Sequence, residues 1–497
     1  MPPKRGSLPL TPCTHTHLLT TPLASQTQFS RISPSRRAAA TTSTGTRRAA
    51  VTDASLSGFA SEIEFASTFP GPLVLEGDDL ATDPKQTGQT FRGWKREKQR
   101  NLVPSESPLA RGKEGRGARR IIYVVGPPGV DGEGVEGFMR GWDECEIKDG
   151  GEGKRDRNGR NIRKEKCKTN NWIPDVISYL QAFYHGLPVK QLDSSLLHFT
   201  PWEDAKPKLS HPNSQSKSKT RSQKILPANK STPIGLRTST FKTCIRARST
   251  PSAPFSHQLN LSDLLDVAID ILPEDAYAVL MLVKHDLYED DDDEFICGRA
   301  YGESRVAVVS TARYDPGLDR LQRVERVHAW PGSHCVEYMG EMCGVGKGGK
   351  RKRKRESVGD EEFAVEGSPL VQAVKLQNTL VPLSPNPSLD ALKGLYLSRI
   401  CRTASHELGH CFGIDHCIYY ACCMQGSASI IEDARQPPYL CPIDLAKVVK
   451  ATGADVKERY EVLLDFCTKH GDAHMFVAFG EWIRARLGQT ELLNRLE

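Results

Sequence analysis

Apolar runs and helically spaced apolar residues alternate along the middle of the chain. Residues 121–125 form an uninterrupted apolar run that Gly126 and two prolines end, which predicts a buried strand. Apolar residues at positions 176, 177, 180 and 183 recur at helical spacing behind a proline at position 174, which predicts a helix. Residues 189–192 then predict a short strand.

The same alternation continues further along the chain. Residues 259–273 predict a helix that an asparagine or a serine can cap and a proline ends. The apolar runs within 275–288 and 304–314 have strand length and predict strands covered on both faces, or nearly so. This order of strands and helices is typical of a mixed α/β or α+β domain with a twisted mixed sheet.

Composition indicates a globular domain accompanied by long polar segments that do not belong to its core. Of the 497 residues, 38% are hydrophobic and 26% charged, and there are 41 glycines and 32 prolines. We predict a disordered, low-complexity N-terminal region over residues 1–118, a folded domain over 119–480 and a C-terminal tail over 481–497. Insertions into the domain are expected near 126–170, 201–232 and 318–366.

Charge is concentrated in local runs. The net charge of +6 is mild and does not indicate a nucleic-acid-binding protein. The acidic run at 289–295 lacks the alternating ligands and glycine turn of a calcium loop, so it predicts a solvated loop. The basic run at 350–355 is either a nuclear localisation patch or an ordinary segment of a disordered loop. No apolar stretch approaches the ~20 residues of a membrane helix, so no membrane association is expected.

Residues 1–51 contain no acidic residue and are rich in arginine, serine, threonine and proline. This bias predicts a disordered tail, and a mitochondrial transit peptide with the same bias is the alternative. The compact apolar core of a secretory signal peptide is missing. We therefore expect an intracellular protein, cytoplasmic or nuclear, unless the acid-poor segment directs it to mitochondria.

A long helix predicted over residues 389–413 carries a metal-binding pattern. His406 and His410 are four residues apart, so they project from one face of a helix, one turn apart. Two imidazoles placed in this way can reach one zinc ion at ~2.0–2.1 Å. Glu407 lies beside them and can act as a general base on a zinc-activated water. A bare HExxH also occurs by chance, so the residues that follow decide its meaning.

Those residues extend the match to HExxHxxGxxH, a zincin pattern. Gly413 can adopt positive φ and end the helix, so that the chain turns back and His416 becomes a third ligand. Three protein ligands with one open position are the catalytic arrangement of zinc. Met424 lies eight residues beyond His416, where a Met-turn would form an apolar floor under the histidines.

Cysteines gather around the same motif. Six of the fourteen lie between Cys401 and Cys441, which in a reducing compartment indicates metal binding rather than disulfide cross-linking. The spacing of Cys417, Cys422 and Met424, followed by Cys441, resembles the signature of the archaemetzincins, metzincin-type zinc peptidases with an added cysteine zinc site. Other segments in order also look like archaemetzincin sequence, and the resemblance covers about residues 119–480.

The resemblance implies two zinc ions. A catalytic zinc would be bound by His406, His410 and His416, with Glu407 as the general base, and a structural zinc by Cys417, Cys422 and Cys441. Asp444 stands where the family has the last cysteine of a CxxC pair. Aspartate can bind zinc, although less well than a thiolate, so we expect a weaker Cys3Asp site.

Two alternatives to the Cys3Asp site remain open. Cys423 is a substitute ligand, although its adjacency to Cys422 makes joint ligation awkward, or the site is empty and its cysteines are reduced. Cys401 and Cys411 are expected to be small core residues.

The leading hypothesis is therefore a zinc-dependent metallopeptidase with a metzincin-like α+β domain around the HExxH helix. It would act on a peptide or protein substrate, which an exposed strand near 304–312 would align. The alternative is a non-catalytic zinc-binding scaffold or interaction protein, nuclear if the basic run is a localisation signal. A nucleic-acid-binding zinc knuckle is disfavoured, because the cysteines lack interleaved aromatic and basic residues. We expect a monomer and no nucleic-acid partner, and the motif does not choose between aminopeptidase and endopeptidase action.

Overall fold

The computed structural model of the chain describes residues 32–45, 68–97, 119–131, 137–145, 172–202, 233–250, 254–332, 367–377, 379–380, 387–471 and 473–494. The basic run at 350–355 and nearly all of the expected insertion at 201–232 lie outside these residues.

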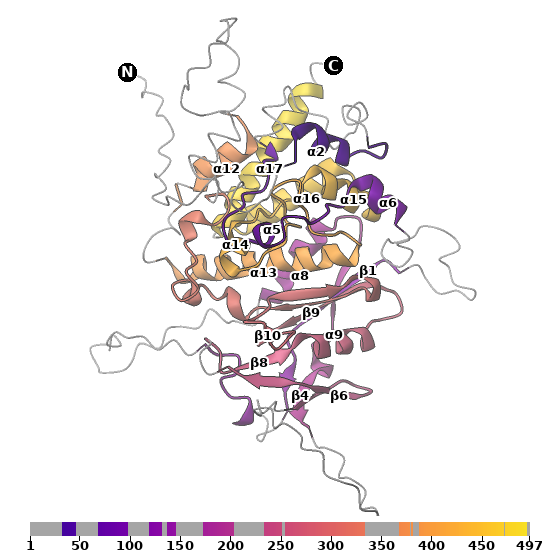
Figure 1. Cartoon of the computed structure of the whole chain (residues 1–497), viewed down its shortest axis with the longest axis vertical. Coiled ribbons are helices and arrows are strands. Elements are labelled where there is room, and N and C mark those ends of the chain that lie inside the picture. Colours follow the sequence, from indigo (N-terminus) through magenta and orange to yellow (C-terminus); the bar gives the residue numbers. More distant parts are fainter. Residues whose placement is uncertain are drawn as a thin grey trace, which may run out of the picture.

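A five-stranded mixed sheet forms the centre of the domain (Figure 1). Its strands lie in the order β11-β12-β9-β1-β3. Their bounds are β1 (Ile121–Val125), β3 (Val189–Leu192), β9 (Ala276–Val283), β11 (Gly298–Tyr301) and β12 (Val306–Ser310). Strands β12, β9, β1 and β3 run parallel to one another. Strand β11 is antiparallel to β12 and forms one edge of the sheet.

Burial on both faces explains the uninterrupted apolar runs of these strands. Every residue of β9 is buried. Leu280 and Leu282 belong to the core on the side of the long motif helix, whereas Val279 and Met281 belong to the core on the opposite side. The predicted strands at 121–125, 189–192 and within 275–288 and 304–314 are confirmed.

Helices cover the two faces of the sheet unequally. Helix α9 (Leu261–Asp270) is the one described helix on one side, and α8, α13, α15, α16 and α17 gather on the other (Figure 1). The bounds of the helices on this second side are α8 (Ile173–Phe183), α12 (Pro369–Gln377), α13 (Leu389–Cys411), α14 (Ile430–Arg435), α15 (Pro442–Thr452), α16 (Val456–Lys469) and α17 (His474–Asn494). Among the described helices, none is long and apolar enough to cross a membrane.

Two small sheets lie beyond α9, and most of their strands were not predicted. One has the order β2-β4-β5-β6 and the other β10-β8-β7. The bounds are β2 (Gly129–Val130), β4 (His198–Pro201), β5 (Ile234–Arg237), β6 (Lys242–Ile245), β7 (Ala247–Ser249), β8 (His257–Asn260) and β10 (Asp286–Tyr288). Each has at most four residues, which is too short for a period-two pattern to stand out from a polar background.

The expectation of disorder throughout residues 1–118 is wrong for two described segments. Residues 32–45 contain α2 (Pro34–Ala40), and residues 68–97 contain α5 (Asp79–Thr82) and α6 (Phe91–Arg96). Phe69, Leu80 and Trp94 are buried in the main core. These apolar residues are few and widely spaced, but the rest of the domain supplies the surface that buries them.

The expectation of a C-terminal tail from residue 481 is also wrong. Helix α17 continues through 481–494, and Trp482 is fully buried and stacks on Tyr439 with ring centroids 4.5 Å apart. The expected insertions are partly ordered as well, since Trp142 and Trp330 are buried. Tertiary contacts therefore order segments that look polar or terminal in the sequence.

Candidate active site

Helix α13 presents the histidine motif at its C-terminal end. The helix begins after Ser388, whose side chain accepts a hydrogen bond from the Ala391 N–H. It ends at Phe412, and Gly413 follows with φ of 69°, a left-handed conformation that glycine adopts at little cost. The turn at Gly413 reverses the chain and brings His416 back towards the helix, as the sequence predicts.

The three histidines converge on one point. One ring nitrogen from each of His406, His410 and His416 lies within 4.8 Å of the others. The Nε2 atoms of His406 and His410 are 3.1 Å apart.

Hydrogen bonds to the opposite ring nitrogens fix the tautomers of two of these histidines. His406 Nδ1 lies 2.7 Å from the carbonyl oxygen of Cys423, and His410 Nδ1 lies 2.7 Å from that of Ile414. A carbonyl oxygen only accepts hydrogen bonds, so each Nδ1 carries the proton and each Nε2 presents a lone pair. Two lone pairs facing each other at this distance repel unless a cation lies between them. The donor set therefore fits a metal ion. The two carbonyl groups orient the rings through hydrogen bonds to Nδ1, as is common for metal-binding histidines.

Burial keeps these groups uncharged. It lowers the pKa of His406 well below its ordinary value and that of His410 to about 3, so both rings are neutral at physiological pH. Burial also raises the pKa of Glu407 to about 8, against the opposing effect of the Arg299 guanidinium. Glu407 therefore holds a proton more readily than an ordinary carboxylate in the absence of a metal ion.

A cleft of about 1230 Å³ opens in front of the histidines. Residues of α13, of edge strand β11 and of the segment 292–297 line it. Arg299 on β11 forms an ion pair with Glu289 at the rim, and Arg402 pairs with Asp433 deeper inside. The acidic run thus contributes to the cleft wall, which the expectation of a purely solvated loop did not include.

The strand beside the cleft is not the expected one. Residues 304–312 are expected to form the exposed strand, but β12 lies between β11 and β9 and all of its residues are buried. The edge strand is β11, which contributes Gly298 to the cleft wall. The order of strands depends on long-range pairing that local hydrophobicity does not encode.

Met424 lies directly beneath the motif helix. A side chain at Gly409 would bring its Cβ to 2.4 Å from the Met424 Sδ atom, so the glycine makes this close approach possible. The Met424 carbonyl accepts a hydrogen bond of 2.8 Å from the Cys417 N–H. Met424 is fully buried and joins the segments that carry the two predicted metal sites.

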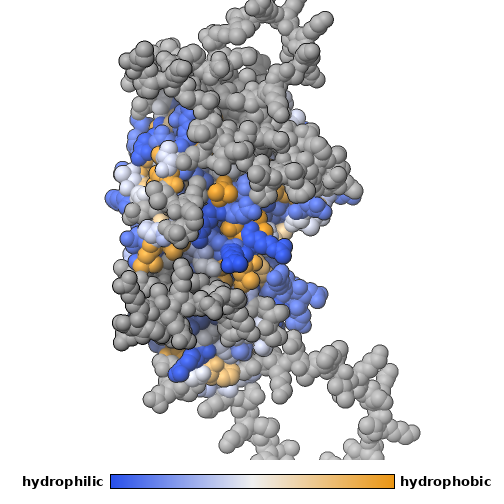
Figure 2. All heavy atoms as spheres, turned by 90° about the vertical axis from the view of Figure 1, so that its left-hand side faces the viewer, coloured by the Kyte–Doolittle hydropathy of each residue, from blue (hydrophilic) through white to orange (hydrophobic). Residues whose placement is uncertain are grey.

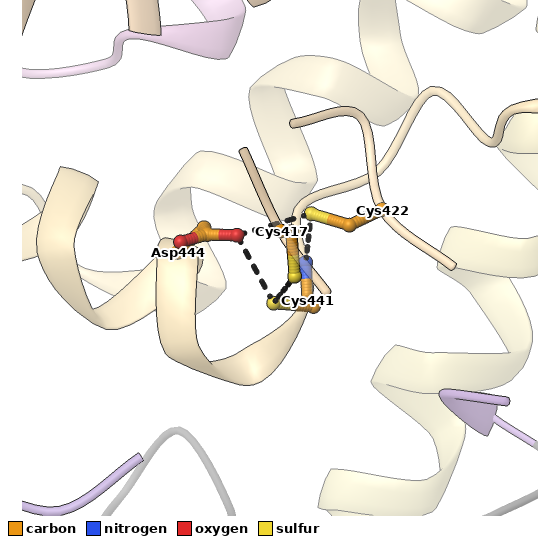
Figure 3. A group of neighbouring side chains, drawn as sticks. All are labelled: Cys417, Cys422, Cys441 and Asp444. Atoms are coloured by element: carbon orange, nitrogen blue, oxygen red, sulfur yellow. Dashed lines mark hydrogen bonds between the residues drawn. The ribbon is translucent and has the colours of Figure 1, made fainter. Parts of the chain in front are cut away.

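Four further ligand-type side chains form a second group (Figure 3). Cys417, Cys422, Cys441 and Asp444 point toward one another, and their ligand atoms lie within 4.8 Å. Asp444 Oδ2 is 3.3 Å from the Sγ atoms of both Cys422 and Cys441, and the Sγ atoms of Cys417 and Cys441 are 3.6 Å apart. Tetrahedral zinc would separate two sulfurs by ~3.8 Å and a sulfur from an oxygen by ~3.6 Å. The spacing therefore fits one small tetrahedral ion.

Cys423 is outside this group. Its Sγ atom lies 3.4 Å from the Ser405 hydroxyl and 3.7 Å from the Arg402 carbonyl, on the side of the motif helix. Cys401 and Cys411 are fully buried in the apolar core, and burial raises the pKa of both thiols. These three cysteines have the surroundings of core residues.

A lysine and a glutamine join the second group to the first, and sequence reasoning missed both. Lys447 Nζ donates to Asp444 Oδ1, the carboxylate oxygen that does not face the cysteines, at 2.8 Å and to the side chain of Gln89 at 2.8 Å. Lys447 lies three residues after Asp444 on α15, a spacing that indicates an ion pair. Gln89 lies more than 300 residues away in the sequence and gives no local signal.

The sequence model of peptidase family M54 matches residues 368–450, which include both ligand groups. Archaemetzincin-2 of Homo sapiens is 30% identical over 207 residues, 42% of this chain and 46% of that protein. The chain is thus similar to the archaemetzincins over the part that carries both ligand groups. Archaemetzincin-1 of Mus musculus is 28% identical over 209 residues, 41% of this chain and 33% of that protein. The chain therefore spans less than half the length of these curated relatives.

A crystal structure of archaemetzincin from Methanopyrus kandleri also matches this chain. The match covers 67% of this chain and 98% of the other, with 16% sequence identity and a TM-score of 0.28. That score is below the level at which a common fold can be argued.

Proposed function

We propose that this protein is a zinc-dependent metallopeptidase with a metzincin-like catalytic domain. The observation that carries the proposal is the pair of inward-facing Nε2 lone pairs of His406 and His410, 3.1 Å apart beside the buried carboxyl group of Glu407. His406, His410 and His416 would hold the metal ion. A zinc ion with three protein ligands and one open position supplies an electrophile for the scissile carbonyl and lowers the pKa of bound water to ~7.

The remaining chemistry is assigned to the chain's own residues. Glu407, which is buried beside the histidines, would accept the proton of the attacking water and then deliver it to the leaving amine. The outer edge of β11 would align an extended peptide through backbone hydrogen bonds, since β11 is the outermost of the described strands and lines the cleft. Met424 supplies an apolar support beneath the histidines.

Cys417, Cys422, Cys441 and Asp444 would hold a second, structural zinc ion. All four are buried, and the protein supplies four ligands, which leaves no open position for catalysis. The distances between their ligand atoms support this part of the proposal.

Metal content and chelator sensitivity test the proposal. We expect two zinc ions per chain in the purified protein, hydrolysis of peptides, loss of hydrolysis after chelation and its return when zinc is added back. Protein free of zinc, or hydrolysis that a strong chelator leaves unchanged after the metal has been removed, would contradict it.

A further inference from the structure

The N-terminal segment 68–97 closes over the turn that carries His416. Trp94 Nε1 donates a hydrogen bond of 2.9 Å to the carbonyl oxygen of Phe412, and Gln89 Nε2 donates one of 2.9 Å to that of Gly413. Carbonyl groups at the end of a helix have no partner within the helix and require one from elsewhere. The segment therefore supplies the C-terminal cap of α13 from the far end of the chain.

The other side of the Gln89 amide binds the same turn and a buried lysine. Gln89 Oε1 accepts hydrogen bonds from the Asp415 N–H at 3.3 Å and from Lys447 Nζ at 2.8 Å. Asp415 directly precedes His416, so the Gln89 amide binds both a carbonyl group and an N–H group of the turn. Gln89 is 8% exposed, and bonds of this kind at a buried position restrict the backbone strongly.

Lys447 is fully engaged between the two metal-binding groups. It is 1% exposed, and its ammonium group donates to Asp444 Oδ1, the Gln89 side chain and the Gln89 carbonyl at 2.8, 2.8 and 3.1 Å. An ammonium group has three donors, so all of them are satisfied. The other oxygen of Asp444 faces the cysteines. A continuous series of contacts thus runs from the sulfur atoms through Asp444, Lys447 and Gln89 to the histidine turn.

We propose that Gln89 is a positioning residue for His416, and that through Lys447 it couples the Cys3Asp group to the histidine group, so that occupancy of one strengthens metal binding by the other. The inference rests on the proposed function, because it assumes that both groups hold metal ions. A metal ion on Asp444 Oδ2 would hold the carboxylate in place and so restrict Lys447. Lys447 would then hold the Gln89 amide against the backbone of residues 413–415. Coupling between two binding sites is reciprocal, so each site senses the other equally.

Site-specific metal affinity tests this inference. Titration of the metal-free protein with Co²⁺ alone separates the two groups, because only the cysteine group gives a thiolate-to-metal charge-transfer band. In Gln89→Ala we expect this band to keep its wild-type intensity, while the histidine group binds Co²⁺ about 10-fold more weakly, because the backbone that positions His416 loses its hydrogen bonds to Gln89. Gln89→Glu keeps the acceptor for Lys447 but replaces the donor to Gly413 and Glu97 by an oxygen atom that both repel, so we expect a loss at least as large.

A matched control separates positioning from ordinary stabilisation. Gln181 also bridges backbone groups, the Leu187 carbonyl at 3.0 Å and the Val189 N–H at 2.7 Å, on helix α8. Gln181→Ala should lower the free energy of unfolding but leave both Co²⁺ affinities unchanged. If Gln89→Ala behaves in the same way, Gln89 is a merely structural residue and the inference is wrong.

A double-mutant cycle tests the coupling itself. Asp444→Ala should weaken Co²⁺ binding by the histidines, and this effect should shrink when Gln89 is already alanine. Strictly additive effects would show that Gln89 carries no coupling, even if wild-type protein binds two metal ions as the proposed function requires. Failure of the wild-type histidines to bind any metal would instead contradict the proposed function, so the two failures are distinguishable.

Discussion

Gly298 on edge strand β11 packs directly against Glu407 on α13. A Cβ atom at position 298 would lie 3.0 Å from Glu407 Cγ and 3.1 Å from Glu407 Oε1, closer than ordinary contact. The carbonyl oxygen of Val308 would be 3.1 Å away on the other side. The position of the proposed general base therefore depends on the absence of a side chain from the facing strand.

Gly298→Ala should displace the Glu407 carboxylate by a few tenths of an ångström. We expect kcat to fall about 10-fold with little change in KM, because misplacement of a catalytic group affects the chemical step. Zinc content should remain that of the wild-type protein. Gly488→Ala is the control, since a Cβ there has no neighbour within 4 Å. An unchanged kcat in Gly298→Ala would show that the carboxylate has room to adjust.

Glu407→Gln should retain both zinc ions and lose hydrolysis. Glutamine has the shape of glutamate but cannot accept the proton of the attacking water, and general-base catalysis contributes ~10²–10⁴-fold to the rate. Zinc analysis and a peptide hydrolysis assay on the same preparation check this. Asp390→Asn provides the control, because Asp390 is an exposed carboxylate at the opposite end of α13. Full activity in Glu407→Gln would favour a different base or the non-catalytic scaffold.

Asp444→Ala should reduce the zinc content from two ions per chain to one. Removal of the only oxygen ligand leaves three thiols and an unpaired Lys447 in a buried site, so thermal stability should also fall. Asp444→Cys should retain two zinc ions, since thiolate is the better zinc ligand. Two zinc ions in Asp444→Ala would show that the aspartate is not a ligand.

His474 should make the protein less stable in mild acid. Burial lowers its pKa to about 4, with Arg399 and Arg326 acting in the same direction and Asp319 opposing them. An unfolded histidine has a pKa of ~6.5, so below that pH the unfolded chain gains a proton that the folded chain refuses. Down to pH ~4, this reduces the free energy of unfolding by up to ~1.4 kcal/mol per pH unit.

Urea unfolding of His474→Gln at pH 7 and pH 5 checks this expectation. The loss of stability between the two values should be smaller than in the wild-type protein by on the order of 1–2 kcal/mol. Contributions from the metal-site histidines are the same in both proteins and cancel. An identical slope in His474→Gln would mean that His474 is protonated equally in both states.

Local sequence was enough to predict the motif helix and the strands of the central sheet. The spacing of His406 and His410 fixes their shared face, and Gly413 marks the reversal that brings His416 back. The predicted fourth ligand, Asp444, also lies with its three cysteines. These relationships extend over a few residues or follow from the resemblance, so periodicity and spacing carry them.

Long-range relationships could not be predicted in this way. The edge position of β11 follows from which strand pairs with which, and the capping role of Trp94 follows from a partner on a distant helix. Short segments such as α5 and α6 have no periodicity to detect. On the face shown in Figure 2, hydrophilic and hydrophobic side chains of the described residues are interspersed, so neither surface chemistry nor sequence pattern singles out one patch there.

The cap of α13 also has a consequence for biosynthesis. Trp94 and its partner Phe412 are separated by 318 residues. At ~5–20 residues per second, a ribosome needs roughly 15–65 s to make the intervening chain. During that time the apolar side chains of residues 68–97 lack the surface around Phe412 that buries them. They are then accessible to chaperones or to other chains. Complete assembly of the histidine turn therefore has to follow synthesis of the 318 residues that separate Trp94 from Phe412.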